Sequence, residues 1–224
     1  MFRDTHGWIS EYRRKDALWI HDGNPRRPHA LLTSGKHSNG FFNSKLVIPD
    51  EDLLCEAALD LLESFSMQGG EVSDVQGVVG PQTGATKLAE FISTPVSIAT
   101  MRKCFSASPA KSEYEGVKSM VFTEKELGQL PGKIVVLCED VLTTGGSVDL
   151  ASTAVTNAGG TTLPFILVLV NRSGLKEVSG KKIIALIDRP MPTWAPDECP
   201  LCKEGSEAIR PKGPPEWARL NDSY

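Results

Sequence analysis

Short apolar runs alternate with helix-spaced apolar stripes along the middle of this chain, and this alternation limits the possible folds more than any other feature. The apolar runs predict strands over residues 75–80, 96–101, 133–139, 163–170 and 182–187. The stripes predict helices over residues 51–68, 83–92 and 147–158. Such a pattern is typical of an α/β protein with a central parallel sheet flanked by helices. Because ligands of such sheets bind beyond the carboxyl ends of the strands, the candidate binding loops follow Gly80, Met101, Glu139 and Val170.

The two ends of the chain differ from this pattern. An N-terminal helix is predicted over residues 8–20, followed by a basic, proline-containing turn at 22–29. Seven of the fifteen prolines lie between residues 190 and 215. Because proline interrupts helices and cannot donate to a sheet ladder, we expect residues 190–224 to form an irregular tail that docks on the rest of the protein.

The composition excludes several classes of protein. The chain has 224 residues, 40% of them hydrophobic, which is enough for one sizeable core. Its longest apolar run is much shorter than the roughly 20 residues of a membrane span, and the N-terminus lacks an apolar signal core. We therefore expect no membrane partner and no export. The net charge of −4 argues against nucleic acid as a partner, and the odd count of five cysteines indicates reduced thiols in a cytoplasm.

Residues 134–147 carry the most informative motif, in which a hydrophobic strand, an acidic pair and a run of small residues are contiguous. The strand delivers Glu139 and Asp140 at its carboxyl end, and Thr143-Thr-Gly-Gly-Ser147 then leads into a helix. Glycines let backbone N–H groups approach a ligand, and a helix start offers free donors. The alternative is a tight turn with solvent-facing acids. The contiguous order favours a binding site for a monophosphate. The adjacent carboxylates could accept hydrogen bonds from sugar hydroxyls or influence a nearby Mg²⁺.

This motif is neither a Walker A loop nor a Gly-x-Gly-x-x-Gly dinucleotide turn. The run from Glu139 to Ser147 resembles the phosphoribosyl-diphosphate-binding motif of type I phosphoribosyltransferases, and most of all that of orotate phosphoribosyltransferases. The similarity extends from about Leu31 to Gly205. Five further stretches carry it, namely Thr33–Asn43, Gly80–Gly84, Arg102-Lys103, Asn171-Arg172 and Cys199–Gly205.

The resemblance implies a type I phosphoribosyltransferase fold in a single domain. Residues 1–48 would form an N-terminal helix and a small hood, residues 49–189 the α/β core, and residues 190–224 the proline-rich tail. The implied reaction transfers the phosphoribosyl group from 5-phosphoribosyl 1-diphosphate to orotate, which gives orotidine 5′-monophosphate and pyrophosphate. The implied cofactor is Mg²⁺, held mainly by substrate and water near Glu139 and Asp140, and the implied assembly is a homodimer.

The same resemblance implies roles for individual residues. Phosphoribosyl diphosphate would be bound by Arg102, Lys103, Glu139, Asp140, Thr143, Thr144, Gly145, Gly146 and Ser147. Orotate would be bound by Phe41, Phe42, Thr143 and Arg172, with the arginine meeting the carboxylate of the base. The implied catalytic residues are Asp140, Lys103 and Lys111.

Two positions depart from the family pattern. Serine or alanine stands in the segment 104–116 where the family carries a lysine in its mobile loop, so Lys111 is the nearest substitute. Thr33 stands where many members have a lysine before Ser-Gly. These departures keep two alternatives open: a phosphoribosyltransferase for another nucleobase, and a regulator that senses phosphoribosyl diphosphate without turning it over.

Several of these residues would also fit ordinary structural roles. Phe41 and Phe42 would serve equally as core aromatics. Arg102 and Lys103 would serve as a solvated pair at a strand end. Arg172 would serve as a cap at the edge of the sheet.

Cys199 and Cys202 have the Cys-x-x-Cys spacing of a metal-ligand pair, but the sequence contains no second such pair. A tight turn with two reduced thiols is the favoured interpretation, and a metal shared across a dimer is the alternative. The four histidines show no pairing with a nucleophile, and no catalytic role is predicted for them.

Overall fold

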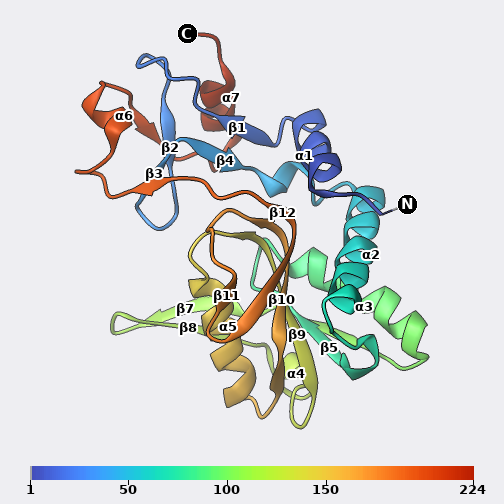
Figure 1. Cartoon of the computed structure of the whole chain (residues 1–224). Helices are drawn as coiled ribbons and strands as arrows, with labels where there is room; N and C mark the ends of the chain where they lie inside the picture. Colours follow the sequence, from blue (N-terminus) through green and yellow to red (C-terminus); the bar gives the residue numbers. More distant parts are fainter. Residues whose placement is uncertain (1) are drawn as a thin grey trace.

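The computed structural model describes residues 2–224 and arranges them in two parts, a large sheet flanked by helices and a group of short strands above it (Figure 1). Among the described residues, no helix combines the length and the apolar character that a membrane span requires.

The large sheet has the strand order β11-β12-β10-β9-β5-β6, and its neighbouring strands are parallel except β11 and β12. Its strands are β5 (Gly77–Val79), β6 (Phe105–Ala107), β9 (Ile134–Leu142), β10 (Thr161–Asn171), β11 (Glu177–Val178) and β12 (Lys181–Asp188). Numbered along the chain, the parallel strands lie in the order 2-1-3-4-5, so the winding reverses between β5 and β9. A reversal of this kind opens a crevice at the carboxyl edge of the sheet, where doubly wound proteins bind ligands.

Helices cover both faces of this sheet because its strands are apolar on both sides (Figure 1). On one face, α1 (Thr5–Arg14), α2 (Glu51–Met67) and α3 (Thr86–Thr100) pack against residues that include Val136 and Leu167. On the other face, α5 (Gly146–Asn157) packs against their strand neighbours, such as Leu137 and Val168. The short helix α4 (Glu124–Leu127) precedes β9.

We call the upper group of strands the hood and define it as residues 18–46 and 193–221. It contains β1 (Leu18–Ile20), β2 (His29–Leu31), β3 (His37–Ser38), β4 (Gly40–Phe42), the short helix Ser44–Leu46, β13 (Thr193–Trp194), α6 (Pro200–Lys203), β14 (Ala208–Ile209) and α7 (Pro214–Asn221). The indole Nε1 of Trp19 donates to the carbonyl of Leu220 over 2.8 Å in the core of the hood. The tail therefore docks on the N-terminal strands, as predicted.

The motif-bearing elements of the core agree with the sequence. Asp50 caps α2, since its side chain accepts a hydrogen bond from the Leu53 amide over 3.1 Å. The strands predicted at 133–139, 163–170 and 182–187 are confirmed as β9, β10 and β12, although β9 continues to Leu142.

Two predicted elements are wrong. The N-terminal helix ends at Arg14 because Asp16 has a left-handed φ of 50°, and residues 18–20 pair with β4 as strand β1. The strand predicted at 96–101 is the second half of α3. Val96 extends the apolar stripe of that helix into the core at 0% exposure, and this burial outweighs the helix-breaking tendency of Pro95.

The tail is also more regular than predicted. Its helix α7 begins with Pro214 and Pro215, in the first turn, where a missing N–H group costs no helical hydrogen bond. Its strands β13 and β14 are two residues each and lie at the edges of a small sheet, where proline-rich chain is tolerated.

One buried carboxylate ties α1 to α2 and leads to a stability prediction. Asp60 accepts hydrogen bonds from the Trp8 indole over 2.9 Å and from the Arg3 amide over 3.0 Å. Asp60→Ala leaves both donors unpaired, so we expect a loss of about 1–3 kcal/mol in the free energy of unfolding. Urea denaturation measures this loss, and Glu63→Ala, an exposed change on the same helix, is the control. Equal stability of the two variants would contradict the prediction.

Candidate functional site

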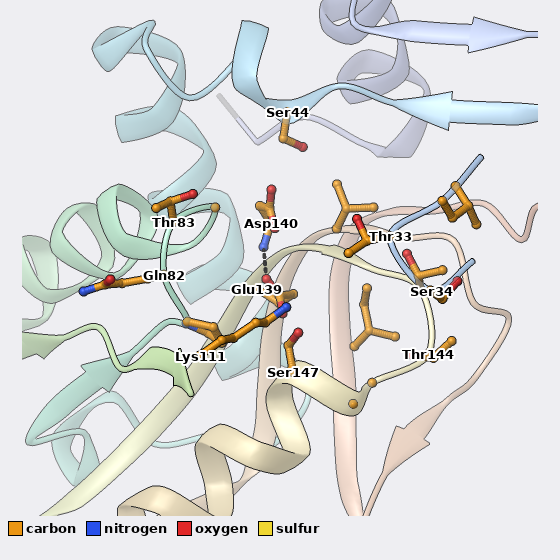
Figure 2. Close-up of a pocket in the computed structure, with 18 of the residues that line it drawn as sticks. Thr33, Ser34, Ser44, Gln82, Thr83, Lys111, Glu139, Asp140, Thr144 and Ser147 are labelled. Carbon is orange, nitrogen blue, oxygen red and sulfur yellow. Dashed lines mark hydrogen bonds between the residues drawn. The ribbon is translucent and has the colours of Figure 1, made fainter. Parts of the chain in front are cut away.

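A pocket of about 1120 Å³ lies between the carboxyl edge of the large sheet and the hood. Its walls come from the loop after β5, the end of β9, the start of α5, the hairpin after β6 and the hood (Figure 2). The strands β5 and β9 flank the winding reversal of the sheet. The pocket therefore lies where the topology predicts a ligand.

The acidic pair forms the floor of this pocket at the end of β9. Glu139 is buried and Asp140 is half-buried, and the Asp140 amide donates to Oε1 of Glu139 over 3.2 Å (Figure 2). Burial raises the pKa of Glu139 well above its usual range, and the nearby charge of Asp140 raises it further, whereas Lys111 lowers it. Donors or a cation that enter the pocket would favour the ionised form of Glu139.

The small-residue turn lies beside the acidic pair, as the sequence predicts, and all its residues from Thr143 to Ser147 line the pocket. Gly145 has a left-handed φ of 82°, and a Cβ atom there would lie 2.6 Å from the Val178 side chain. The helix α5 starts at the next residue, so its free N–H groups lie at the pocket. This geometry provides the backbone and hydroxyl donors that a phosphate group requires.

The loop after β5 packs directly against the acidic pair. A Cβ atom at Gly84 would lie 2.6 Å from the carboxylate atoms of Asp140, so a glycine is what lets the carboxylate occupy its position. Gln82 and Thr83, joined by a cis peptide bond, line the pocket from the same loop (Figure 2). The Gln82 amide donates to the Pro109 carbonyl over 3.0 Å, which fixes the loop to the next strand segment.

A methyl group at Gly84 therefore tests the placement of Asp140. We expect Gly84→Ala to displace the Asp140 carboxylate. The rate of the reaction catalysed in the pocket should fall roughly 10- to 100-fold, because misplacement of a group by about 1 Å can have such effects. The folded state should lose little stability, since the displaced atoms end a flexible side chain. Gly128→Ala, where a Cβ meets its neighbours only at 3.6 Å or beyond, is the control. Full activity of Gly84→Ala would refute the proposed placement.

Arg172 is a buried cation without an acidic partner. The side chain is 2% exposed, and it donates from Nη1 to the Gly40 carbonyl over 3.0 Å and from Nη2 to Ser38 Oγ over 2.6 Å. Its Nε has no hydrogen-bond partner, and within residues 2–224 no carboxylate forms an ion pair with it. Burial lowers its pKa to about 10, so the group stays charged at neutral pH. Arg172 lines the pocket, where an anion would compensate its charge.

The two aromatics of β4 occupy different environments because neighbouring strand residues face opposite sides. Phe42 is 3% exposed and packs edge-on against Tyr12, with ring centres 5.3 Å apart. Phe41 is half-buried against Trp217, with ring centres 5.8 Å apart. Both line the pocket, but Phe41 retains more surface for a ligand.

The predicted basic residues divide into two groups. Lys111 lies on β7 (Ala110–Tyr114), which pairs with β8 (Val117–Val121), and it extends toward Glu139 (Figure 2). The residues after Cys104 thus form β6 and a hairpin in the structure. Arg102 and Lys103 are exposed and lie outside the pocket of their own chain, and Arg102 donates to the Ser73 carbonyl.

Three cations of the pocket are not predicted by the sequence patterns, and one of them, Lys118, lies on β8 opposite Glu113. Lys45 and Lys212 line it from the hood, and Lys45 Nζ donates to the Lys212 carbonyl over 3.4 Å. The position of Lys45, two residues after the stretch Thr33–Asn43 that carries the family resemblance, is a weak local signal. Lys212 reaches the pocket only because the tail docks on the N-terminal strands of the hood, and no local pattern predicts that docking.

Known proteins are similar to this chain in sequence. A family model described as the phosphoribosyl transferase domain matches residues 56–200. An orotate phosphoribosyltransferase of Desulforamulus reducens is 33% identical over 192 residues, which cover 82% of this chain and 87% of the relative. An orotate phosphoribosyltransferase of Acidithiobacillus ferrooxidans is 31% identical over 211 residues, covering 87% of this chain and 93% of the relative.

Solved structures share the fold. The crystal structure of orotate phosphoribosyltransferase from Aeropyrum pernix superposes with a TM-score of 0.57 at 21% identity, covering 80% of this chain and 91% of that chain. The crystal structure of adenine phosphoribosyltransferase from Rhodothermus marinus gives a TM-score of 0.54 at 16% identity, covering 80% of this chain and 97% of that chain. At these identities the likeness establishes the architecture and leaves the nucleobase open.

Proposed function

Since the chain belongs to the phosphoribosyltransferase family, we propose that it transfers the phosphoribosyl group from 5-phosphoribosyl 1-diphosphate to orotate, giving orotidine 5′-monophosphate and pyrophosphate. The type I phosphoribosyltransferase fold predicted from the sequence is confirmed. The named relatives at about 30% identity support orotate as the base.

The buried guanidinium of Arg172 carries the assignment of the base. Arg172 lines the pocket, its buried Nε has no hydrogen-bond partner, and among the described residues it has no acidic partner. Orotate differs from the other common nucleobases in its carboxylate, and a guanidinium binds a carboxylate with a geometry that lysine cannot copy. A neutral purine would leave this charge buried and uncompensated, which is costly.

The remaining residues fit a reaction that depends on positioning and charge. The 5′-phosphate would lie on Thr143–Ser147, and the ribose hydroxyls would donate to Glu139 and Asp140. Lys111 would approach the diphosphate from the hairpin. Glycosyl transfer of this kind passes through an oxocarbenium-like state, so the protein must fix the sugar and the leaving group and stabilise charge, and no protein nucleophile is required.

The donors of the pocket fit Mg²⁺ that binds together with the diphosphate. Glu139 and Asp140 supply carboxylate oxygens at the pocket. Within residues 2–224, the only group of three or more His, Cys, Asp or Glu side chains close enough to hold a metal ion lies outside the pocket, so the protein alone does not enclose an ion there. Mg²⁺ commonly keeps several waters and uses one or two carboxylates with substrate oxygens. When bound, it would neutralise part of the diphosphate charge.

In a homodimer, the exposed pair Arg102 and Lys103 could contact the substrate bound to the neighbouring subunit. Arg102 and Lys103 lie outside the pocket of their own chain, which supports an action on the site of a neighbouring subunit, as the family resemblance implies. The five free cysteines support a reducing, cytoplasmic location.

The direct test combines the pure protein with phosphoribosyl diphosphate, Mg²⁺ and orotate. We expect orotate to disappear and pyrophosphate to appear in equal amounts. The unusual segment 104–116, which lacks the expected lysine, favours transfer to a different base as the second candidate, so adenine, hypoxanthine and uracil are tested in parallel. Turnover with one of these instead of orotate would replace the proposal. Binding of phosphoribosyl diphosphate without turnover of any base would indicate a regulator.

A further inference from the structure

A second cluster of reactive side chains lies in the hood, and none of its members lines the pocket. His29 and His37 begin the strands β2 and β3, whereas Cys199 and Cys202 lie at the start of α6 and within it. One nitrogen or sulfur atom from each residue lies within 4.8 Å of the others. The tail strands β13 and β14 pair with the two outer edges of the β2–β3 hairpin, so they hold α6 beside it (Figure 1).

The separations match a tetrahedral metal site. His29 Nε2 lies 3.5 Å from the sulfur of Cys199, 3.5 Å from that of Cys202, and 3.0 Å from His37 Nδ1. His37 Nδ1 lies 3.2 Å from the Cys202 sulfur. Zinc binds sulfur at about 2.3 Å and nitrogen at about 2.0 Å, so a tetrahedron of two of each has edges of roughly 3.3–3.8 Å. The four atoms need only small shifts to surround such an ion.

The hydrogen bonds around His29 leave its inward nitrogen free to bind a cation. Ser206 Oγ donates its single proton to the Arg27 carbonyl over 2.6 Å, and it accepts from His29 Nδ1 over 2.8 Å. A neutral imidazole that donates at Nδ1 carries its lone pair on Nε2. Metal-binding histidines commonly donate their second N–H in this way, which fixes the ring.

Hydrogen bonds or a disulfide would account for less of this arrangement than a metal ion does. His29 and Cys199 are both 0% exposed, so water cannot satisfy their polar atoms. Hydrogen bonds alone would satisfy these atoms poorly, because thiols are weak donors. A disulfide between Cys199 and Cys202 would leave the two oriented imidazoles without a ligand, and both cysteines are free in the structure. Two thiolates and two imidazoles in a tetrahedron are the donor set of structural zinc sites.

We propose that His29, His37, Cys199 and Cys202 bind one zinc ion that fastens the C-terminal tail to the β2–β3 hairpin of the hood. Four protein ligands close the coordination sphere, so the ion is structural and does not take part in the reaction. The ligands come from distant parts of the chain, so the ion closes a long loop and restricts the unfolded chain. It also stiffens β3, whose Ser38 holds Arg172.

Metal analysis of the full-length protein tests this proposal. After purification without chelators or a metal-affinity tag, we expect close to one zinc per chain by inductively coupled plasma mass spectrometry. Unfolding in the presence of a thiol reagent should release the same amount to a chromogenic chelator. Co²⁺ reconstitution should give the intense visible bands of tetrahedral Co²⁺ and thiolate charge transfer in the near ultraviolet. These readouts do not depend on activity, so they stand or fail separately from the proposed reaction.

A pair of cysteine variants locates the ion. Cys202→Ser removes a partly exposed ligand, whereas Cys55→Ser changes an exposed thiol of α2. We expect the first variant to lose most of its zinc and its Co²⁺ charge-transfer bands, with a fall in Tm of about 5 °C or more. The second should keep one zinc per chain and the wild-type Tm. If Cys202→Ser fails to fold, the wild-type Co²⁺ spectrum decides the question.

The proposal is overturned if the full-length protein contains no metal and Co²⁺ gives no charge-transfer bands. It is also overturned if Cys202→Ser and Cys55→Ser retain the same zinc content. A disulfide between Cys199 and Cys202 in freshly purified protein, found by mass spectrometry, would likewise replace the zinc site.

Discussion

Replacement of Arg172 by alanine should abolish most orotate turnover while leaving the binding of phosphoribosyl diphosphate nearly unchanged. The guanidinium is 2% exposed, its buried Nε has no hydrogen-bond partner, and Arg172 lines the pocket. Loss of a charge-assisted contact of this kind costs about 1.5–3 kcal/mol, which corresponds to a fall of roughly 10- to 150-fold in kcat/KM for orotate. Steady-state kinetics with saturating phosphoribosyl diphosphate measures this fall, and calorimetry measures the binding of the diphosphate.

The matched control is Arg189→Ala, since Arg189 follows β12 and does not line the pocket. It should retain wild-type kinetics. Because Arg172 also bonds to Ser38 and Gly40, its loss should loosen β3 and β4, so Tm is measured alongside. Equal losses for orotate and for phosphoribosyl diphosphate in Arg172→Ala would show that the residue only supports the fold.

The phosphate cradle could be predicted because its parts are contiguous. The strand, the two acids and the small-residue turn occupy residues 134–147, so local pattern alone orders them. Two boundaries there differ from the prediction. The helix α5 begins at Gly146, one residue early, and β9 continues past the acids to Leu142 because it pairs with β10 up to Asn171. Pairing with a neighbouring strand is a tertiary effect that local sequence does not report.

The hood could not be predicted in the same way. Its sheet joins residues 29–38 to residues 193–209, and this long-range pairing brings Lys212 to the pocket and His29 beside Cys199. The sequence shows a Cys-x-x-Cys pair and separate histidines, but only the docked tail puts them together. In α3, likewise, Pro95 locally disfavours a helix, but the burial of Val96 in the core stabilises the helical conformation.

Asp140→Asn should keep the fold and lower kcat roughly 100-fold, since the amide retains the shape of the side chain but loses a charged acceptor for the ribose. Asp140 lies beside Gly84 at the floor of the pocket, so the sugar would be held where charge develops during transfer. Asp188→Asn is the control, because Asp188 ends β12 and pairs with Lys176 outside the pocket. Near-normal rates in Asp140→Asn would refute the role.

The same variant should change the pH dependence through Glu139. The charge of Asp140 disfavours ionisation of Glu139 and so contributes to its raised pKa; the neutral amide removes this contribution, and the pKa of Glu139 falls. If the ionised carboxylate accepts the ribose hydroxyls, the acidic limb of kcat/KM moves to lower pH in Asp140→Asn. Profiles of both proteins between pH 4 and pH 9 measure the direction. If Glu139 instead acts in its protonated form, as a donor to the sugar or diphosphate oxygens, the alkaline limb moves to lower pH and the acidic limb stays in place. An acidic limb that does not move in Asp140→Asn would therefore contradict the prediction.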